Sequence, residues 1–125
     1  MSGLFVPSVE TGTLVFVSGH IARRDGQPWV GRLGETMTAA EGRQAARAVA
    51  EDLLKTLGDL SRIRRIVKVM VLVNSASDFT EQHLVANGAS ELLIESVSEH
   101  ARSAFGVAQL PFGVCVEIEL VAELR

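Results

Sequence analysis

The sequence predicts an α+β fold in which two helices pack on one face of a mixed β-sheet. Residues 66–73 form a nearly continuous apolar, β-branched run, and residues 114–124 alternate between apolar and mostly acidic side chains. Residues 38–57 repeat apolar side chains with helical spacing. Because 125 residues suffice for one hydrophobic core and are too few for two, we expect one domain that spans residues 1–125.

The N-terminal part predicts a strand over residues 13–20 that Gly19 ends. The following segment, residues 23–28, contains Gly, Pro and charged residues, so we expect a turn-rich connector. Trp29 comes directly after it and is expected to cover the edge of the core or a cleft.

The first helix has the clearest signals. Thr38 and Glu41 have the spacing of a capping box, in which each side chain binds the backbone of the other residue. Gly58 is expected to end this helix. Its apolar face consists of Ala46, Val49, Ala50, Leu53 and Leu57.

The middle of the chain predicts a buried strand and a second helix. The apolar run at residues 66–73 is typical of a strand covered on both faces, so we expect it near the centre of the sheet. Asp78 and Glu81 have the spacing of a second capping box. Gly88 interrupts the helical pattern, so we expect one or two short first turns and a main helix over about residues 87–98, capped by Asn87.

The last quarter of the chain contains the most informative polar residues. Residues 103–109 and 114–124 are β-rich, and Pro and Gly at residues 110–113 separate them, so we expect a hairpin. Glu117 belongs to the acidic face of the second strand, and Arg102 stands at the start of the first. The pair is a candidate ligand site, because a guanidinium binds a small carboxylate with two hydrogen bonds. A cross-strand ion pair on a solvated sheet is the alternative.

Composition narrows the class of protein. Hydrophobic residues make up 47% and the mean hydropathy is +0.26, so we expect that a homo-oligomer buries part of the apolar surface. The net charge of −3 and the absence of a basic stripe argue against a nucleic-acid partner. No apolar run is long enough for a membrane span, and Cys115 is the only cysteine, so we expect a cytoplasmic protein without a membrane partner.

Three blocks of the chain carry motifs that occur together in one known family. They are LVFVSGHI at residues 14–21, IVKVMVLV at residues 66–73, and ARSA at residues 101–104 with the later LP and EIE motifs at residues 110–111 and 117–119. In this order they resemble the reactive intermediate deaminase (RidA/YjgF) family of imine and enamine deaminases. The NGAS segment at residues 87–90 and the HARSA segment at residues 100–104 resemble a divergent branch of that family.

The resemblance implies a chorismate-mutase-like homotrimer with ligand clefts between neighbouring subunits and no cofactor. In it, Arg102 would bind the carboxylate of a 2-imino or 2-enamino acid, and Glu117 would be the general base for the attacking water. Gly19 would allow the backbone to approach the ligand, and Asn87 would match an asparagine of the second helix. The candidate substrate-binding set therefore consists of Arg102, Gly19, His20, Asn87, Ser103 and Ala104.

The chain departs from the family pattern at several positions. Residues 4–9 lack the family's Gly-Pro-Tyr-Ser-Gln segment, and Ala104 replaces a cysteine, which puts the substrate in question. His20 and His100 could flank the cleft and move protons near neutral pH, with ordinary exposed or capping histidines as the alternative. These two histidines, His83 and Cys115 do not have metal-ligand spacing, so we expect no metal.

Together these features predict a cofactor-free hydrolase that converts reactive 2-imino and 2-enamino acids to ketoacids and ammonia. The alternative is a non-catalytic trimer of the same family that binds a small carboxylate-bearing molecule. RNA cleavage, named in older descriptions of relatives, is the least favoured function, since the sequence shows neither a basic groove nor an aromatic stacking platform.

Overall fold

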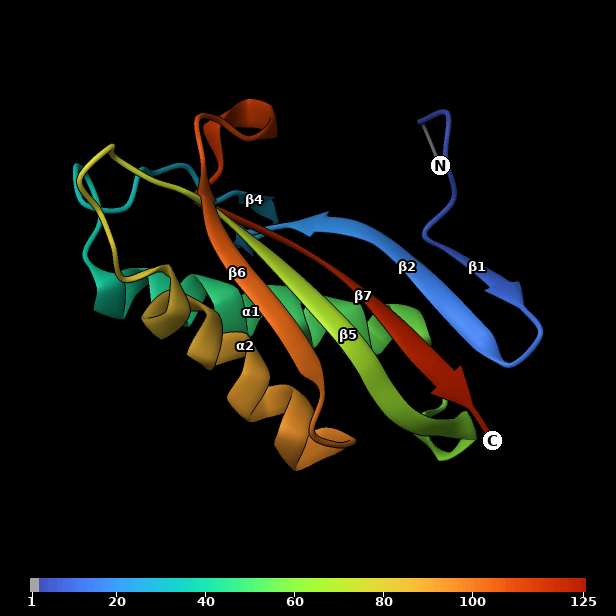
Figure 1. The fold of residues 1–125 in the computed structure, drawn as a ribbon. Helices are drawn as coiled ribbons and strands as arrows, with labels where there is room; N and C mark the ends of the chain where they lie inside the picture. Colours follow the sequence, from blue (N-terminus) through green and yellow to red (C-terminus); the bar gives the residue numbers. More distant parts are fainter. Residues whose placement is uncertain (1–2) are drawn as a thin grey trace.

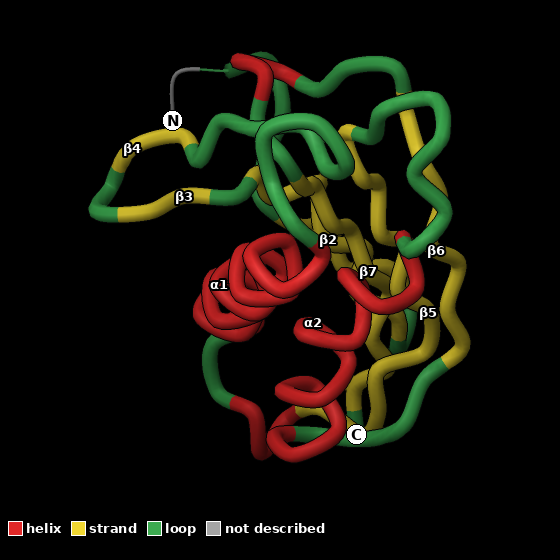
Figure 2. The backbone as a smooth tube through the Cα atoms, turned by 90° about the vertical axis from the view of Figure 1, so that its left-hand side faces the viewer, coloured by secondary structure: helices red, strands yellow, loops and turns green. Residues whose placement is uncertain are grey.

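Two helices cover one face of a five-stranded β-sheet, as the sequence predicts (Figure 1). The structure is a computed structural model that describes residues 3–125. Figure 2 shows both helices on the same side of the strands, so the molecule has two layers. Helix α1 (Ala39–Leu57) packs over β2 and β7, and α2 (Gln82–Ser96) packs over β5 and β6.

The strands of the sheet are β1 (Ser8–Thr11), β2 (Leu14–Ile21), β5 (Ile63–Asn74), β6 (Ala101–Val107) and β7 (Val116–Leu124). Strands β3 (Arg23–Arg24) and β4 (Gln27–Pro28) form a small separate hairpin in the predicted connector. Two short 3-10 turns lie at Leu60–Arg62 and Pro111–Gly113.

The order of the strands, β1-β2-β7-β5-β6, shows that the predicted hairpin between the last two strands is wrong. Strand β5 lies between β6 and β7 and pairs parallel to β6 and antiparallel to β7. A parallel pair needs a long crossover, which α2 provides. The turn signals near Pro111 are real, since Phe112 has a φ of 60° and Gly113 a φ of 71°, but the turn leads past β5.

The first helix agrees with its sequence signals. The Thr38 hydroxyl accepts a hydrogen bond from the Glu41 amide at 3.2 Å, and the Glu41 carboxylate accepts one from the Thr38 amide at 3.0 Å. This confirms the predicted capping box. Gly58 ends the helix with a φ of 77°.

The second helix differs from its prediction, because it runs from Gln82 to Ser96 without interruption. Glu81 occupies the N-cap position without a side-chain hydrogen bond, so the predicted Asp78–Glu81 capping box does not form. Asn87 lies inside the helix and does not cap it. Gly88 lies where α2 meets α1, and a β-carbon there would overlap the backbone carbonyl oxygen of Arg43. Close helix packing therefore explains this glycine.

The two faces of the sheet differ in their surroundings. On β5, Val69, Val71 and Val73 are completely buried under the helices, whereas Lys68 and Met70 are half-buried on the face that the helices leave uncovered. Within one chain β5 is therefore covered on one face only, and the cover of its other face by neighbouring subunits stays a prediction. Apolar side chains on the uncovered face include Phe16 and Phe105, which are 46% and 41% exposed.

Trp29 packs against the core from its edge, and the Arg24 guanidinium lies 4.4 Å from the centre of the indole ring. Within residues 3–125, neither helix has both the length and the apolar composition that crossing a membrane requires.

The packing of Gly88 predicts the effect of a single methyl group. Gly88→Ala should lower the free energy of unfolding by about 2 kcal/mol, because the new β-carbon meets backbone that cannot rotate away. Helix propensity alone would predict a gain of up to about 1 kcal/mol. Urea unfolding at a fixed protein concentration distinguishes the two signs.

His83→Ala is the matched control, because His83 is exposed on the same helix. We expect this variant to stay within about 0.5 kcal/mol of the wild type. A Gly88→Ala protein as stable as the wild type would show that α1 and α2 do not pack this closely.

Candidate functional site

Arg102 lies on β6, an edge strand of the sheet, with its side chain on the helix-covered face. Its Nη1 atom donates one hydrogen bond to Asn87 Oδ1 at 2.9 Å and one to Ser90 Oγ at 3.0 Å. Both acceptors belong to α2, which the crossover places beside β6. Two residues of the predicted site, Arg102 and Asn87, are therefore in direct contact.

The contacts of Arg102 involve only one of its three guanidinium nitrogens. A guanidinium carries five N–H groups, and the two on Nη1 are used by Asn87 and Ser90. Among residues 3–125, no carboxylate forms a salt bridge with Arg102, and no acceptor binds its Nε or Nη2. The Nε and Nη2 hydrogens lie in one plane, which is the geometry that holds a carboxylate by two parallel hydrogen bonds.

Glu117 lies on β7 with its side chain on the uncovered face of the sheet, as the alternating pattern predicts. Its carboxylate rests against the backbone of Gly19 on the neighbouring strand β2, where a β-carbon would collide with it. The sheet register shifts between Val17 and His20, so β2 has a bulge at this position. Gly19 thus leaves room for a carboxylate of the protein itself.

The surroundings of Glu117 raise the pKa of its carboxyl. Burial raises the pKa of this carboxyl above its ordinary value of 4.5, and the charge of Glu119 raises it further. His20 opposes this shift, because a positive imidazole stabilises the carboxylate. A carboxylate with a raised pKa is a better proton acceptor than an ordinary glutamate.

Arg102 and Glu117 do not lie together within one chain, contrary to the paired strands that the sequence predicted. Arg102 is next to Val69 on β5, which faces the helices, whereas Glu117 is next to Leu72, which faces away from them. The sheet therefore separates the two side chains. The sequence prediction placed the two side chains together because it expected β6 and β7 to form a hairpin. In the structure β5 lies between these two strands.

The other predicted residues have more ordinary surroundings. Both ring nitrogens of His20 are within 2.7 Å of partners, the Ser18 carbonyl oxygen and the Thr56 hydroxyl of α1, so the ring joins β2 to α1. Ser103 accepts a hydrogen bond from Lys68 Nζ at 3.1 Å on the uncovered face, opposite to the Arg102 side chain. Ala104 packs against the core beneath the helices.

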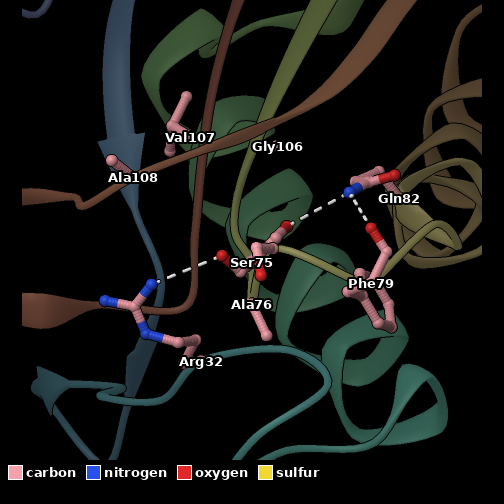
Figure 3. Close-up of a pocket in the computed structure, with 9 residues that line it drawn as sticks. Arg32, Ser75, Ala76, Phe79, Gln82, Gly106, Val107 and Ala108 are labelled. Carbon is pink, nitrogen blue, oxygen red and sulfur yellow. Dashed lines mark hydrogen bonds between the residues drawn. The ribbon is translucent and has the colours of Figure 1, made fainter.

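A cavity with a volume of about 520 Å³ lies at the C-terminal ends of β5 and β6 (Figure 3). Arg32 donates a hydrogen bond to the Ser75 carbonyl oxygen at 3.3 Å, and Gln82 Nε2 donates one to the Phe79 carbonyl oxygen at 2.8 Å. Sequence reasoning missed these residues and also Ser90. Each of them lies near a strand end or beside the edge strand β6, so the strand order would have pointed to them.

Burial raises the pKa of the Cys115 thiol to about 11, so this cysteine stays protonated at neutral pH. In the described part of the chain, no group of three or more His, Cys, Asp or Glu residues is arranged to hold a metal ion.

Comparison with known proteins identifies the family. Residues 1–124 match the family model described as Endoribonuclease L-PSP. Protein TCP17 of Trypanosoma cruzi is 46% identical over 130 residues, which cover 97% of this chain and 81% of TCP17.

Solved structures agree with this match. Protein Atu1372 of Agrobacterium tumefaciens, whose function is unknown, is 38% identical with a TM-score of 0.93, over 96% of this chain and 82% of Atu1372. A candidate endoribonuclease of Shewanella oneidensis MR-1 is 27% identical with a TM-score of 0.93, over 99% of this chain and 87% of the Shewanella chain. The chain therefore belongs to the endoribonuclease L-PSP family, the RidA/YjgF family that its sequence blocks resemble.

Proposed function

We propose that this protein is a cofactor-free deaminase that hydrolyses reactive 2-imino and 2-enamino acids in the cytoplasm. The observation that carries the proposal is the Nε/Nη2 edge of Arg102, a half-buried residue on an edge strand, which has no hydrogen-bond partner among residues 3–125. That edge suits the carboxylate that every 2-imino acid carries. The crystal structure of Escherichia coli TdcF contains bound serine, which also carries a carboxylate. At 22% identity, the similarity between TdcF and this chain shows a shared fold only.

The proposed reaction assigns one role to each of two residues. Arg102 holds the substrate carboxylate, and Glu117 removes a proton from the water that attacks the imine carbon. The new C–O bond gives a carbinolamine, and its nitrogen takes up the proton from Glu117. The carbinolamine hydroxyl then transfers its proton through Glu117 to the nitrogen, the C=O bond forms, and the C–N bond breaks to release ammonia. The products are a ketoacid and ammonia, and no redox step occurs.

The reaction needs both residues in one cleft, and in our proposal a homotrimer supplies it. Glu117 and apolar side chains such as Phe16 lie on the uncovered face, while Arg102 lies at the open edge of the sheet. A neighbouring subunit that covers this face with its β6 edge would bring its Arg102 towards Glu117. Gly19, His20 and Asn87 would then belong to the same cleft, with Ser103 and Ala104 beside it.

A non-catalytic trimer that binds a small carboxylate is the second candidate. It is favoured by the fact that the surroundings of Arg102 are complete within one chain, whereas Glu117 lies elsewhere. Ketoacid binding without turnover would support this function and contradict the deaminase.

Substitution of the two residues should affect different kinetic constants. Glu117→Gln should lower kcat by about 10²- to 10⁴-fold, because it removes the proton acceptor. Arg102→Ala should raise KM by at least about 10-fold, because it removes charged hydrogen bonds to the substrate. The measurement is ammonia and ketoacid release from 2-imino acids generated freshly by an amino-acid oxidase.

Arg64→Ala and Glu51→Gln serve as controls, since both residues are exposed and lie outside the proposed cleft. We expect wild-type rates for these variants. Equal rates for Arg102→Ala and wild type would refute the role of Arg102 in the reaction.

Mixing the two variants, assayed at a substrate concentration below the wild-type KM where both are slow, tests whether the cleft lies between subunits. In mixed trimers of Arg102→Ala and Glu117→Gln, about a quarter of the clefts should combine an intact arginine with an intact glutamate. We therefore expect coexpression to restore about a quarter of the wild-type activity. Activity that stays at the level of the separate variants would contradict a shared cleft between subunits and with it the joint role of the two residues.

The raised pKa of Glu117 also predicts how stability depends on pH. Between 4.5 and the higher pKa of the folded protein, the folded state binds more protons than the unfolded state. The free energy of unfolding contributed by Glu117 therefore falls as the pH rises through this window. Glu117→Gln should be more stable than the wild type above the window and nearly equal to it below.

Urea unfolding between pH 4 and pH 8, at one protein concentration, measures this difference. Glu51→Gln, an exposed change on α1, should follow the wild type at each pH. A difference between Glu117→Gln and wild type that stays constant with pH would contradict the raised pKa.

A further inference from the structure

Three polar side chains join α2 to the start of β6. Ser90 Oγ lies 2.9 Å from His100 Nε2 and 3.0 Å from Arg102 Nη1. Ser90 is only 8% exposed, so water does not readily replace either partner. Buried hydroxyl groups in such positions stabilise one arrangement of their neighbours.

The chemistry of these groups fixes the direction of each hydrogen bond. Arg102 can only donate, so Ser90 Oγ accepts from Nη1. The Ser98 carbonyl oxygen, 3.4 Å from His100 Nδ1, can only accept, so the proton of the neutral ring lies on Nδ1. His100 Nε2 then carries no proton and accepts from the hydroxyl of Ser90.

We propose that Ser90 and His100 are positioning residues, which hold Arg102 with its Nε/Nη2 edge towards the substrate carboxylate and couple carboxylate binding to protonation of His100. This inference rests on the proposed function, because it takes Arg102 as the group that binds the carboxylate. It adds two residues that do not touch the substrate but determine how Arg102 presents its hydrogens.

Arg102 is the charged group that acts most directly on His100. Burial lowers the pKa of His100, the Ser98 carbonyl raises it, and the positive charge of Arg102 lowers it. On α2, Glu91 and Glu95 form salt bridges with Arg43 and Arg47 of α1. The neighbouring Glu99 is exposed, so solvent screens its charge.

The sign of the coupling follows from reciprocity. A carboxylate bound to Arg102 offsets the charge that disfavours protonated His100, so the bound carboxylate raises the pKa of His100. By linkage, protonated His100 must then bind the carboxylate more tightly than neutral His100 does. Ser90 Oγ has two lone pairs and can accept from both cations, so Arg102 keeps its contact. Carboxylate affinity should therefore rise as the pH falls through the titration of His100.

Calorimetric titration of the full chain with pyruvate, the smallest 2-ketoacid, tests the inference between pH 5 and pH 8. The wild type should bind pyruvate about 5-fold more tightly at the low end, near the lower limit of typical coupling. His100→Gln keeps an acceptor for Ser90 but does not titrate, so it should lose this pH dependence. Ser90→Ala should weaken binding by about 10-fold, because it removes a hydrogen bond to a charged group.

His83→Ala is the control, because this exposed histidine lies on the same helix outside the cluster. Nitrogen-15 NMR of the imidazole gives a second readout that needs no ligand. It should show His100 protonated at Nδ1 at pH 8.

The outcomes separate the inference from the proposed function. A His100 ring protonated at Nε2, or the same pH dependence in wild type and His100→Gln, would overturn the inference and leave the role of Arg102 intact. Wild-type protein that binds no pyruvate at any pH would overturn the carboxylate-binding role of Arg102 and this inference with it.

Discussion

The parallel pairing of β5 with β6 is the constraint on which the rest of the structure depends. Parallel neighbours cannot be joined by a tight turn, so α2 must cross the sheet between them. The crossover makes β6 an edge strand and sends β7 to the other side of β5. It also places Asn87 and Ser90 over the start of β6, where both bind Arg102. The surroundings of the arginine are therefore a consequence of the strand order.

Local sequence patterns predicted most of the helices and strands, but not which strands lie next to each other in the sheet. The capping box at Thr38 and the alternation of β7 depend on residues a few positions apart, and both are confirmed. The turn near Pro111 was predicted correctly, but no local pattern indicates that β5 lies between β6 and β7, the two strands that this turn connects. Strand order depends on contacts between distant segments, which no local pattern records.

Gly88 shows why the second helix was predicted to be shorter than it is. A glycine inside a helical pattern normally lowers the stability of the helix. Here the absence of a side chain lets α2 approach the backbone of α1, and packing outweighs propensity. The same continuous helix carries Asn87 and Ser90 at positions three residues apart, on one face. A helix starting at residue 87 would have used Asn87 as a cap and left Arg102 without this partner.

The separation of Arg102 from Glu117 within one chain has a chemical consequence. Opposite charges in contact would form an ion pair, which uses the hydrogen bonds of the guanidinium and lowers the pKa of the carboxyl. On opposite faces of the sheet, Arg102 keeps its Nε/Nη2 edge free and Glu117 keeps a raised pKa. Each group thus retains the property that the proposed reaction needs from it. A cleft between subunits could then join the two groups with a substrate and a water between them, so that neither neutralises the other.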